Sequence, residues 1–347
     1  MVQRTLLRTT VVGSYPQPDW LLDKAVLRGQ RVPRVRAEGM WRVAAEVREE
    51  AIRDASLLAI LDMEAADIDV ITDGESARES YSNHFLGALE GVDAVSAATI
   101  ISGTGHETRV PRVLGAIKHV RPVEQTHARL LREHTSRTAK VTLPGPFTLA
   151  QQAKDEHYGD IDAMAFAFAE AINEEALLLQ TTGIDVIQLD EPWLRNDPVG
   201  ARRYGLQVLN RALQGITVRK ALHTCFGYAF LRPGDKSRSY DFLAELADSS
   251  VDEISIEAAQ PRLDLGVLAE LSNKDIALGV LDHSTPVVEA VDRVAERIRA
   301  GLAYIQPERL LPAPDCGMKY MTRADAFARL HSLSQAATRV RRELTGS

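Results

Sequence analysis

The fold is decided by the stretch "IDVIQLDE", at residues 184–191. In it, a short run of apolar and β-branched residues ends in two carboxylates. Such a run is typical of a buried strand. Polar side chains directly after a strand are what barrel enzymes place at the carboxyl end of their sheet. The pattern of an apolar run followed by a polar tail recurs along the whole chain.

Further runs of this kind occupy residues 9–14, 67–74, 139–145, 217–224, 251–257, 275–282 and 309–315. Segments with apolar residues at helical spacing lie between most of them, for example at 41–61 and 286–304. Strands that alternate with helices predict an α/β fold with a parallel sheet. We therefore expect a closed (β/α)8 TIM barrel, with an open doubly wound sheet as the alternative. The first run has no Gly-rich dinucleotide fingerprint after it, which disfavours that alternative.

Residues 92–117 differ from the rest, because they alternate in polarity and contain several glycines. This composition predicts a β-hairpin-like insertion after the second βα unit. We expect the insertion to belong to a single catalytic domain spanning residues 1–347.

The composition excludes several classes of protein. The chain has 347 residues, of which 45% are hydrophobic and 26% charged, as in ordinary globular proteins. Its net charge of -7 gives no basic footprint for nucleic acid. It has no uncharged run of membrane-spanning length, and its N-terminus does not resemble a signal peptide. Two cysteines cannot form a disulfide scaffold, so we expect a cytoplasmic enzyme acting on small molecules. A homo-oligomer stays open.

Metal-capable residues stand in the tails of three predicted strands: His223, Cys225, Glu257 and Cys316. Zinc accepts imidazole, thiolate and carboxylate ligands, and alternate residues such as His223 and Cys225 share one face of a strand. Taken singly, each cysteine could be a small buried hydrophobe and the histidine a core residue. A nucleophilic Cys225 paired with His223 is another interpretation, but it leaves Cys316 unexplained. The absence of C-x-x-C pairs disfavours a structural zinc knuckle. Together the tails predict a zinc site.

The order of the motifs adds a resemblance to this reading. The chain contains "VVGSYP", "DGESAR", "LPGPFT", "QLDEPWL", "HTC", "SIEAAQ", "GVLD" and "APDCGMK" in sequence, from about Thr9 to Arg339. It thereby resembles the C-terminal catalytic barrel of cobalamin-independent methionine synthase, and especially the short single-barrel relatives of that enzyme. The resemblance implies a zinc-dependent methyltransferase that converts homocysteine to methionine.

The same resemblance assigns roles to individual residues. It implies that His223, Cys225, Glu257 and Cys316 hold Zn²⁺, which activates the homocysteine thiol. It implies that Ser14, Glu75 and Asp190 bind the amino-acid end of homocysteine, and two carboxylates do suit an ammonium group. Glu191 and Asp282 are expected to orient the ligands or the donor.

The chain also departs from the family pattern. Gln152 occupies the position of an aromatic residue that stacks on the folate donor. The proton-relay histidine of the family lies two residues after the Asp of "GVxD". Here His283 follows Asp282 immediately, and Ser284 has the expected place. A shift of one residue reverses the side-chain direction on a strand end. We nevertheless take His283 as the candidate acid that protonates the leaving group.

These departures concern the methyl donor, which could be a methylfolate, a methylated corrinoid or another small methylated compound. One alternative function is zinc-dependent alkylation of another thiol, as in relatives that add coenzyme M to epoxides. The sulfonate of coenzyme M would be repelled by Glu75 and Asp190, which favours homocysteine. The alternative outside catalysis is a zinc-stabilised barrel that only binds a thiol.

Overall fold

Parallel strands form the centre of the molecule, as the sequence predicts. The computed structural model describes residues 6–29, 32–101, 107–228, 240 and 242–346. Within this part, the sheet has the strand order β1-β4-β6-β7-β8-β9-β10, and all neighbours are parallel. The strands are β1 (Val70–Ile71), β4 (Thr138–Pro144), β6 (Val186–Asp190), β7 (Arg219–Thr224), β8 (Glu253–Ile256), β9 (Asp275–Leu281) and β10 (Leu310–Pro314). Each lies inside one of the predicted runs, give or take one residue.

The sheet closes into a ring through the predicted first strand. The amide of Thr10 donates to the carbonyl of Pro312 in β10 over 3.0 Å, and the amide of Val11 donates to Val70 in β1 over 3.3 Å. The only bridge of this segment to β1 among the described residues joins Thr10 and Val70, so it is less regular than the run at 9–14 predicted. It still fills the gap between the two edge strands. The prediction of a (β/α)8 barrel is therefore confirmed.

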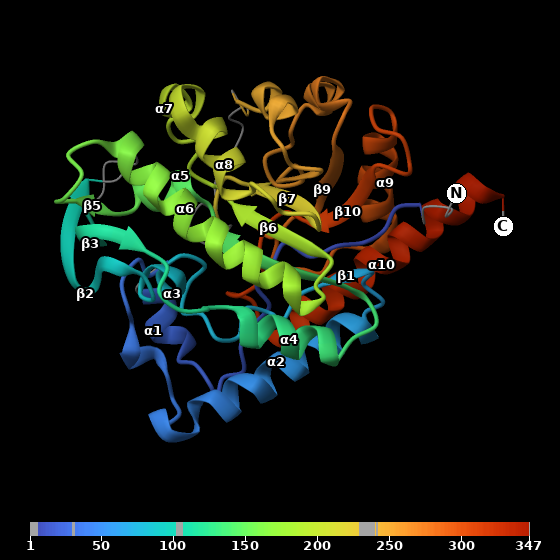
Figure 1. The fold of residues 1–347 in the computed structure, drawn as a ribbon. Coiled ribbons are helices and arrows are strands. Elements are labelled where there is room, and N and C mark those ends of the chain that lie inside the picture. Colours follow the sequence, from blue (N-terminus) through green and yellow to red (C-terminus); the bar gives the residue numbers. More distant parts are fainter. Residues whose placement is uncertain (1–5, 30–31, 102–106, 229–239, 241, 347) are drawn as a thin grey trace.

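Helices surround the ring (Figure 1). The larger ones are α2 (Arg48–Ala65), α4 (Gln125–Glu133), α6 (Ile161–Leu179), α8 (Leu206–Ala212), α9 (Val291–Leu302) and α10 (Arg323–Thr345), and the short ones are α1 (Lys24–Gly29), α3 (Asn83–Leu86), α5 (Pro146–Gln151) and α7 (Pro198–Gly200). Side-chain caps start α6 and α10, where Asp160 and Thr322 accept backbone amides. Between β7 and β9 the described residues form 3-10 turns instead, at Ala244–Asp248 and Leu265–Leu271. No helix in the described part is both long and apolar enough to span a membrane.

The hairpin insertion is formed by β2 (Glu90–Ile101) and β3 (Glu107–Lys118), which pair antiparallel. The short strand β5 (Lys154–Asp155) adds to β3 in parallel. The hairpin comes after the second barrel strand and before α4, so it enters ahead of the helix of that unit. Val113 and Ile117 of β3 belong to the same buried cluster as Phe168 of α6, and Figure 1 shows β3 beside that helix. The predicted hairpin is confirmed.

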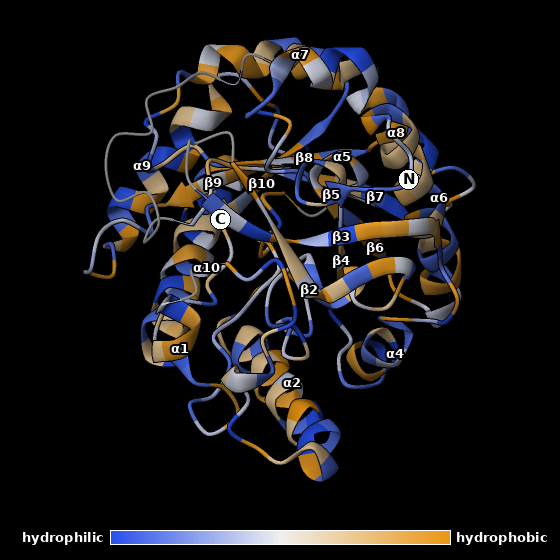
Figure 2. Ribbon diagram, turned by 90° about the vertical axis from the view of Figure 1, so that its left-hand side faces the viewer, coloured by the Kyte–Doolittle hydropathy of each residue, from blue (hydrophilic) through white to orange (hydrophobic). Residues whose placement is uncertain are grey.

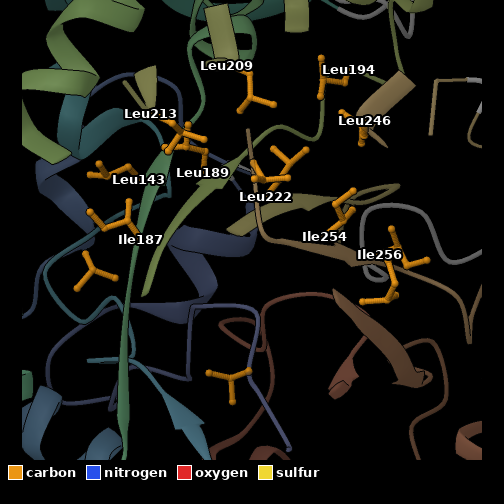
Figure 3. Packing of buried hydrophobic residues seen from close by; sticks show 14 of the residues in the cluster. Leu143, Ile187, Leu189, Leu194, Leu209, Leu213, Leu222, Leu246, Ile254 and Ile256 are labelled. Carbon is orange, nitrogen blue, oxygen red and sulfur yellow. The ribbon is translucent and has the colours of Figure 1, made fainter. Parts of the chain in front are cut away.

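Apolar side chains fill the space between the strands and the helices. Figure 3 shows Leu189 of β6 beside Leu213, the residue after α8, whereas Ile254 of β8 lies toward Leu246. In Figure 2 the outer helices carry interspersed hydrophilic and hydrophobic residues, as expected for helices with one face on a core. The core thus lies outside the ring, and the carboxyl ends of the strands are left to polar side chains.

Candidate functional site

Three of the predicted metal ligands meet at the carboxyl end of the barrel. His223 lies near the end of β7, Cys225 directly follows this strand, and Cys316 lies two residues beyond β10. One ligand atom from each lies within 4.8 Å of the other two. The sulfur atoms of Cys225 and Cys316 are 3.9 Å apart, both residues are buried, and neither forms a disulfide. Residues 91 positions apart thus form one compact cluster.

The imidazole of His223 is oriented by the neighbouring strand. The parallel register places His223 opposite Ser255 in β8, and Nδ1 of His223 lies 3.0 Å from Oγ of Ser255. The other ring nitrogen, Nε2, is buried and has no hydrogen-bond partner among the described residues. An unpartnered buried nitrogen beside two thiols is what a metal ligand looks like without its ion. The donor set of one imidazole and two sulfurs fits zinc.

The electrostatics of the cluster favour ionised sulfur. The hydrogen bond from Cys316 holds the pKa of the Cys225 thiol well below its usual range, and His223 acts in the same direction against the effect of burial. Burial opposes a charged imidazole, but Cys225 raises the pKa of His223 above its ordinary value. Thiolate is the form of cysteine that binds metals.

The fourth predicted ligand, Glu257, follows β8 directly. Its carboxylate is completely buried, and Oε2 accepts the backbone amide of Phe226 over 2.7 Å. Phe226 is the residue after Cys225, so Glu257 lies next to the cluster but outside the group of three. The hydroxyl of Tyr240 accepts the amide of Glu257 over 2.9 Å and fixes the backbone there. The ligand role of Glu257 stays a prediction.

Glu75 is held in an unusual backbone conformation at the same end of the barrel. Its φ of 55° lies in the left-handed region, directly after Gly74 at 76°. Strain of this kind persists where the surrounding structure determines the position of a side chain. Thr142 of β4 donates to Oε1 of Glu75 over 2.9 Å, and the buried guanidinium of Arg78 lies 3.9 Å from that oxygen.

Asp190 ends β6 and lies within electrostatic reach of Glu75 and His223. Burial raises the pKa of Asp190 to about 7, Glu75 adds to this rise, and His223 opposes it. Gln188 donates to Oδ1 of Asp190 over 2.8 Å. The side-chain oxygen Oε1 of Gln188 in turn accepts a hydrogen bond from Nζ of the buried Lys140 over 2.9 Å. A chain of buried hydrogen bonds therefore positions this carboxylate.

Ser14 is buried on the segment that closes the ring, and its carbonyl accepts the amide of Met318 over 2.8 Å. A Cβ atom added to Gly317 would lie 2.3 Å from Oγ of Ser14, so this glycine permits the close approach. Ser14 and Cys316 are thus drawn to the same place by the pairing of the two ends of the barrel. Its substrate contact stays a prediction.

Glu191 has a local partner. Its two carboxylate oxygens accept the amides of Phe147 and Thr148, over 2.9 and 2.7 Å, at the start of α5. The side chain is completely buried, and burial raises its pKa to about 8. These bonds occupy both carboxylate oxygens with the first turn of α5. The geometry describes a residue that positions α5, and a contact with substrate stays a prediction.

Asp282 and His283 lie in the turn after β9, and both are partly buried. Oδ1 of Asp282 accepts the amide of Ser284 over 2.8 Å and its hydroxyl over 2.6 Å. The carbonyl of Asp282 accepts a guanidinium nitrogen of Arg329 over 3.0 Å. This turn stands at the catalytic end of the barrel, but the part of either residue in catalysis stays a prediction.

Several residues of the site were not predicted from the sequence. Ser255 was missed, although it stands two residues before the predicted Glu257 and this spacing could have indicated a shared face. Arg78 stands in the quoted motif "DGESAR", yet nothing in that motif shows that its guanidinium pairs with distant groups. Lys140 and Gln188 sit inside apolar runs, and such buried polar residues indicate a network that only the register reveals.

The chain is similar to known proteins over nearly its whole length. Residues 7–339 match a family model described as cobalamin-independent synthase, catalytic domain. A methionine synthase of Thermococcus kodakarensis is 32% identical over 342 residues, which cover 98% of this chain and 95% of that protein. A methionine synthase of Sulfolobus acidocaldarius is 32% identical over 344 residues, covering 98% and 94%.

One solved structure is similar over nearly its whole length. It is a B12-independent methionine synthase from a Shewanella species in complex with selenomethionine. It is 29% identical, covers 99% of this chain and 100% of its own, and has a TM-score of 0.90.

Proposed function

Because the chain belongs to the cobalamin-independent methionine synthase family, a family of methyltransferases, we propose that it methylates the thiol of homocysteine to give methionine. The observation that carries the proposal is the unpartnered Nε2 of His223, which lies among two buried sulfurs at the carboxyl end of the barrel. The relative from Shewanella was solved with selenomethionine, an analogue of this product.

We propose that His223, Cys225 and Cys316 hold one zinc ion, with Glu257 as the fourth ligand. A zinc ion in such a site lowers the pKa of a thiol that binds to it, while two thiolate ligands keep the bound sulfur electron-rich. Nδ1 of His223 lies against Ser255, and a proton held there would leave Nε2 for the metal. The low pKa of Cys225 supplies the thiolate that the ligand set requires.

The amino-acid end of homocysteine is assigned to the carboxylates at the mouth of the barrel. Glu75 and Asp190 are buried and would accept the ammonium group, while Ser14 would donate to the substrate carboxylate. Glu191 fixes α5, and Gln188 fixes Asp190, so the binding groups are held before the substrate arrives. In the reaction, the sulfur forms a bond to the methyl carbon. The bond from the donor to that carbon breaks, and the donor keeps the electron pair and takes up a proton, for which His283 is the candidate source.

The donor is proposed only by class: a methylfolate, a methylated corrinoid or another small methylated compound. Thiolates must stay reduced to bind a metal, so we propose a reducing, cytoplasmic location. Neither proposal depends on the oligomeric state.

The test combines metal analysis with a donor screen. Purified protein should contain about one zinc ion per chain at this site, and Cys316→Ser should remove this metal and the activity together. Homocysteine is offered with each donor class, and thioether formation is read by mass spectrometry. Coenzyme M with an epoxide serves as the competing pair. Product from that pair alone would replace homocysteine methylation with the other alkyl transfer. Full activity without zinc would refute the metal assignment.

A further inference from the structure

A second cluster of metal-capable side chains lies apart from the thiol site. His84 belongs to α3, Glu124 directly precedes α4, and His127 lies in the first turn of that helix. One ligand atom from each lies within 4.8 Å of the other two. None of these residues belongs to the site described above.

Glu124 carries the argument, because one of its oxygens has no partner. The side chain is only 2% exposed. Oε1 faces the guanidinium of Arg78, with Nε at 3.0 Å, and lies 3.8 Å from Nε2 of His84. Oε2 is buried and has no hydrogen-bond partner among the described residues. A buried acceptor without a partner costs free energy, which a bound cation would offset.

The charge states of Glu124 and His84 suit a metal. Burial favours the neutral form of Glu124, but Arg78 holds the pKa of this carboxyl below its usual value, so it is a carboxylate. Burial lowers the pKa of His84, which keeps a ring lone pair available at neutral pH. The rings of His84 and His127 meet edge to face, with centroids 6.4 Å apart, and both residues are only partly buried. Solvent can therefore complete the coordination of an ion held here.

We propose that His84, Glu124 and His127 form a second binding site for a divalent transition-metal ion such as zinc. Two imidazoles and one carboxylate are a frequent protein ligand set for such ions, with water in the open positions. The positive Arg78 would remain on Oε1, since it also donates to the hydroxyl of Thr142 over 2.7 Å and its charge is shared with Glu75. Oε2 is then the oxygen left for the ion.

The site would tie together two segments that precede and follow the hairpin. α3 ends the loop that carries Glu75 and Arg78, whereas α4 starts after β3. An ion bound by His84 and Glu124 would fix the first segment to the second. Through Arg78 it would also stabilise the position of Glu75, so it is a positioning device with no part in bond making.

Cobalt(II) distinguishes the two sites, because only thiolate ligands give an intense charge-transfer band in the near ultraviolet. The titration uses the metal-free full chain and Co²⁺ alone. The parent should bind about two ions, one with that band and one without it. Cys225→Ser should lose the band and keep about one ion, whereas His84→Ala combined with His127→Ala should keep the band and lose the other ion. The control is His134→Ala, an exposed histidine of the same helix region, which should retain both.

A thermal melt guards against variants that fail to fold. The Cys225→Ser protein should melt at a higher temperature with zinc than with chelator. Adding the two histidine substitutions should abolish this difference. Retention of the band-free ion by the double histidine variant would overturn the proposal. So would a folded Cys225→Ser protein that binds no Co²⁺. A parent protein that binds Co²⁺ without the thiolate band would contradict the thiol site and would still support this second site.

Discussion

Removing the hydroxyl of Ser255 should weaken zinc binding without touching a metal ligand. Ser255 is 2% exposed, and its Oγ lies 3.0 Å from Nδ1 of His223. In Ser255→Ala, Nδ1 of His223 loses its buried hydrogen-bond partner, which costs about 1–3 kcal/mol. Loss of such a partner typically weakens metal affinity by about 10–100-fold. The two magnitudes agree, because tenfold in affinity equals about 1.4 kcal/mol.

The assay is competition for zinc with a chromophoric chelator, run on the metal-free parent and variant. Ser56→Ala is the matched control: Ser56 is completely buried on α2, and its hydroxyl has no hydrogen-bond partner in the described part of the chain. Both variants should stay folded in chelator, with Ser255→Ala melting at a lower temperature because of its lost hydrogen bond, and only Ser255→Ala should release zinc more readily. Equal zinc affinity of Ser255→Ala and the parent would show that Ser255 does not orient the ligand.

Three further substitutions test the binding groups and the core. Asp190→Asn should raise the KM for homocysteine by about 10–100-fold, because a charged hydrogen bond to the ammonium is lost, and should leave the KM of the donor unchanged; an unaltered KM for homocysteine would contradict the assignment. Lys140 is buried, which lowers its pKa to about 8, so the unfolded chain binds more protons than the folded one between about pH 8 and 10, and the free energy of unfolding should rise with pH there by up to about 3 kcal/mol. Urea unfolding should show a smaller rise in Lys140→Met, and equal slopes against pH in the two proteins would refute the lowered pKa. Gly145→Ala would place a Cβ atom 2.1 Å from the carboxyl carbon of Glu191 and should cost about 1–3 kcal/mol in urea unfolding, whereas Gly29→Ala, with nothing within 4 Å, should unfold like the parent.

The barrel could be predicted because its strands are buried on both faces and are followed by polar, metal-capable side chains. Val186–Asp190 shows both features, as a buried run that is apolar except for Gln188 and ends in the carboxylates of Asp190 and Glu191. The segment at 9–14 carries the same pattern, but within the described residues it makes only one bridge to β1, because the edge strands on either side of it are positioned by the whole ring. The short turns between β7 and β9 were also not predicted, because helical spacing in a short segment does not determine the type of helix.

The candidate site was predictable only as far as single strand tails allow. His223 and Cys225 are close in sequence, and the resemblance supplied Cys316 from a distant motif. The hydrogen bond between His223 and Ser255 depends on the register of β7 against β8, which the sequence does not encode locally. The two hydrogen bonds to Glu191 likewise depend on the position of α5. The sequence therefore predicts a carboxylate near the site, but not that both of its oxygens accept backbone amides.

The pairing of Thr10 with Pro312 has a consequence for the order in which the molecule is completed. Thr10 and Pro312 are 302 positions apart in the chain, and Cys316 lies just beyond Pro312. A partly synthesised or partly folded chain can thus present His223 and Cys225 but not the second thiol. Tight zinc binding would then be acquired only when the last strand has paired, so an incomplete barrel would bind the metal weakly.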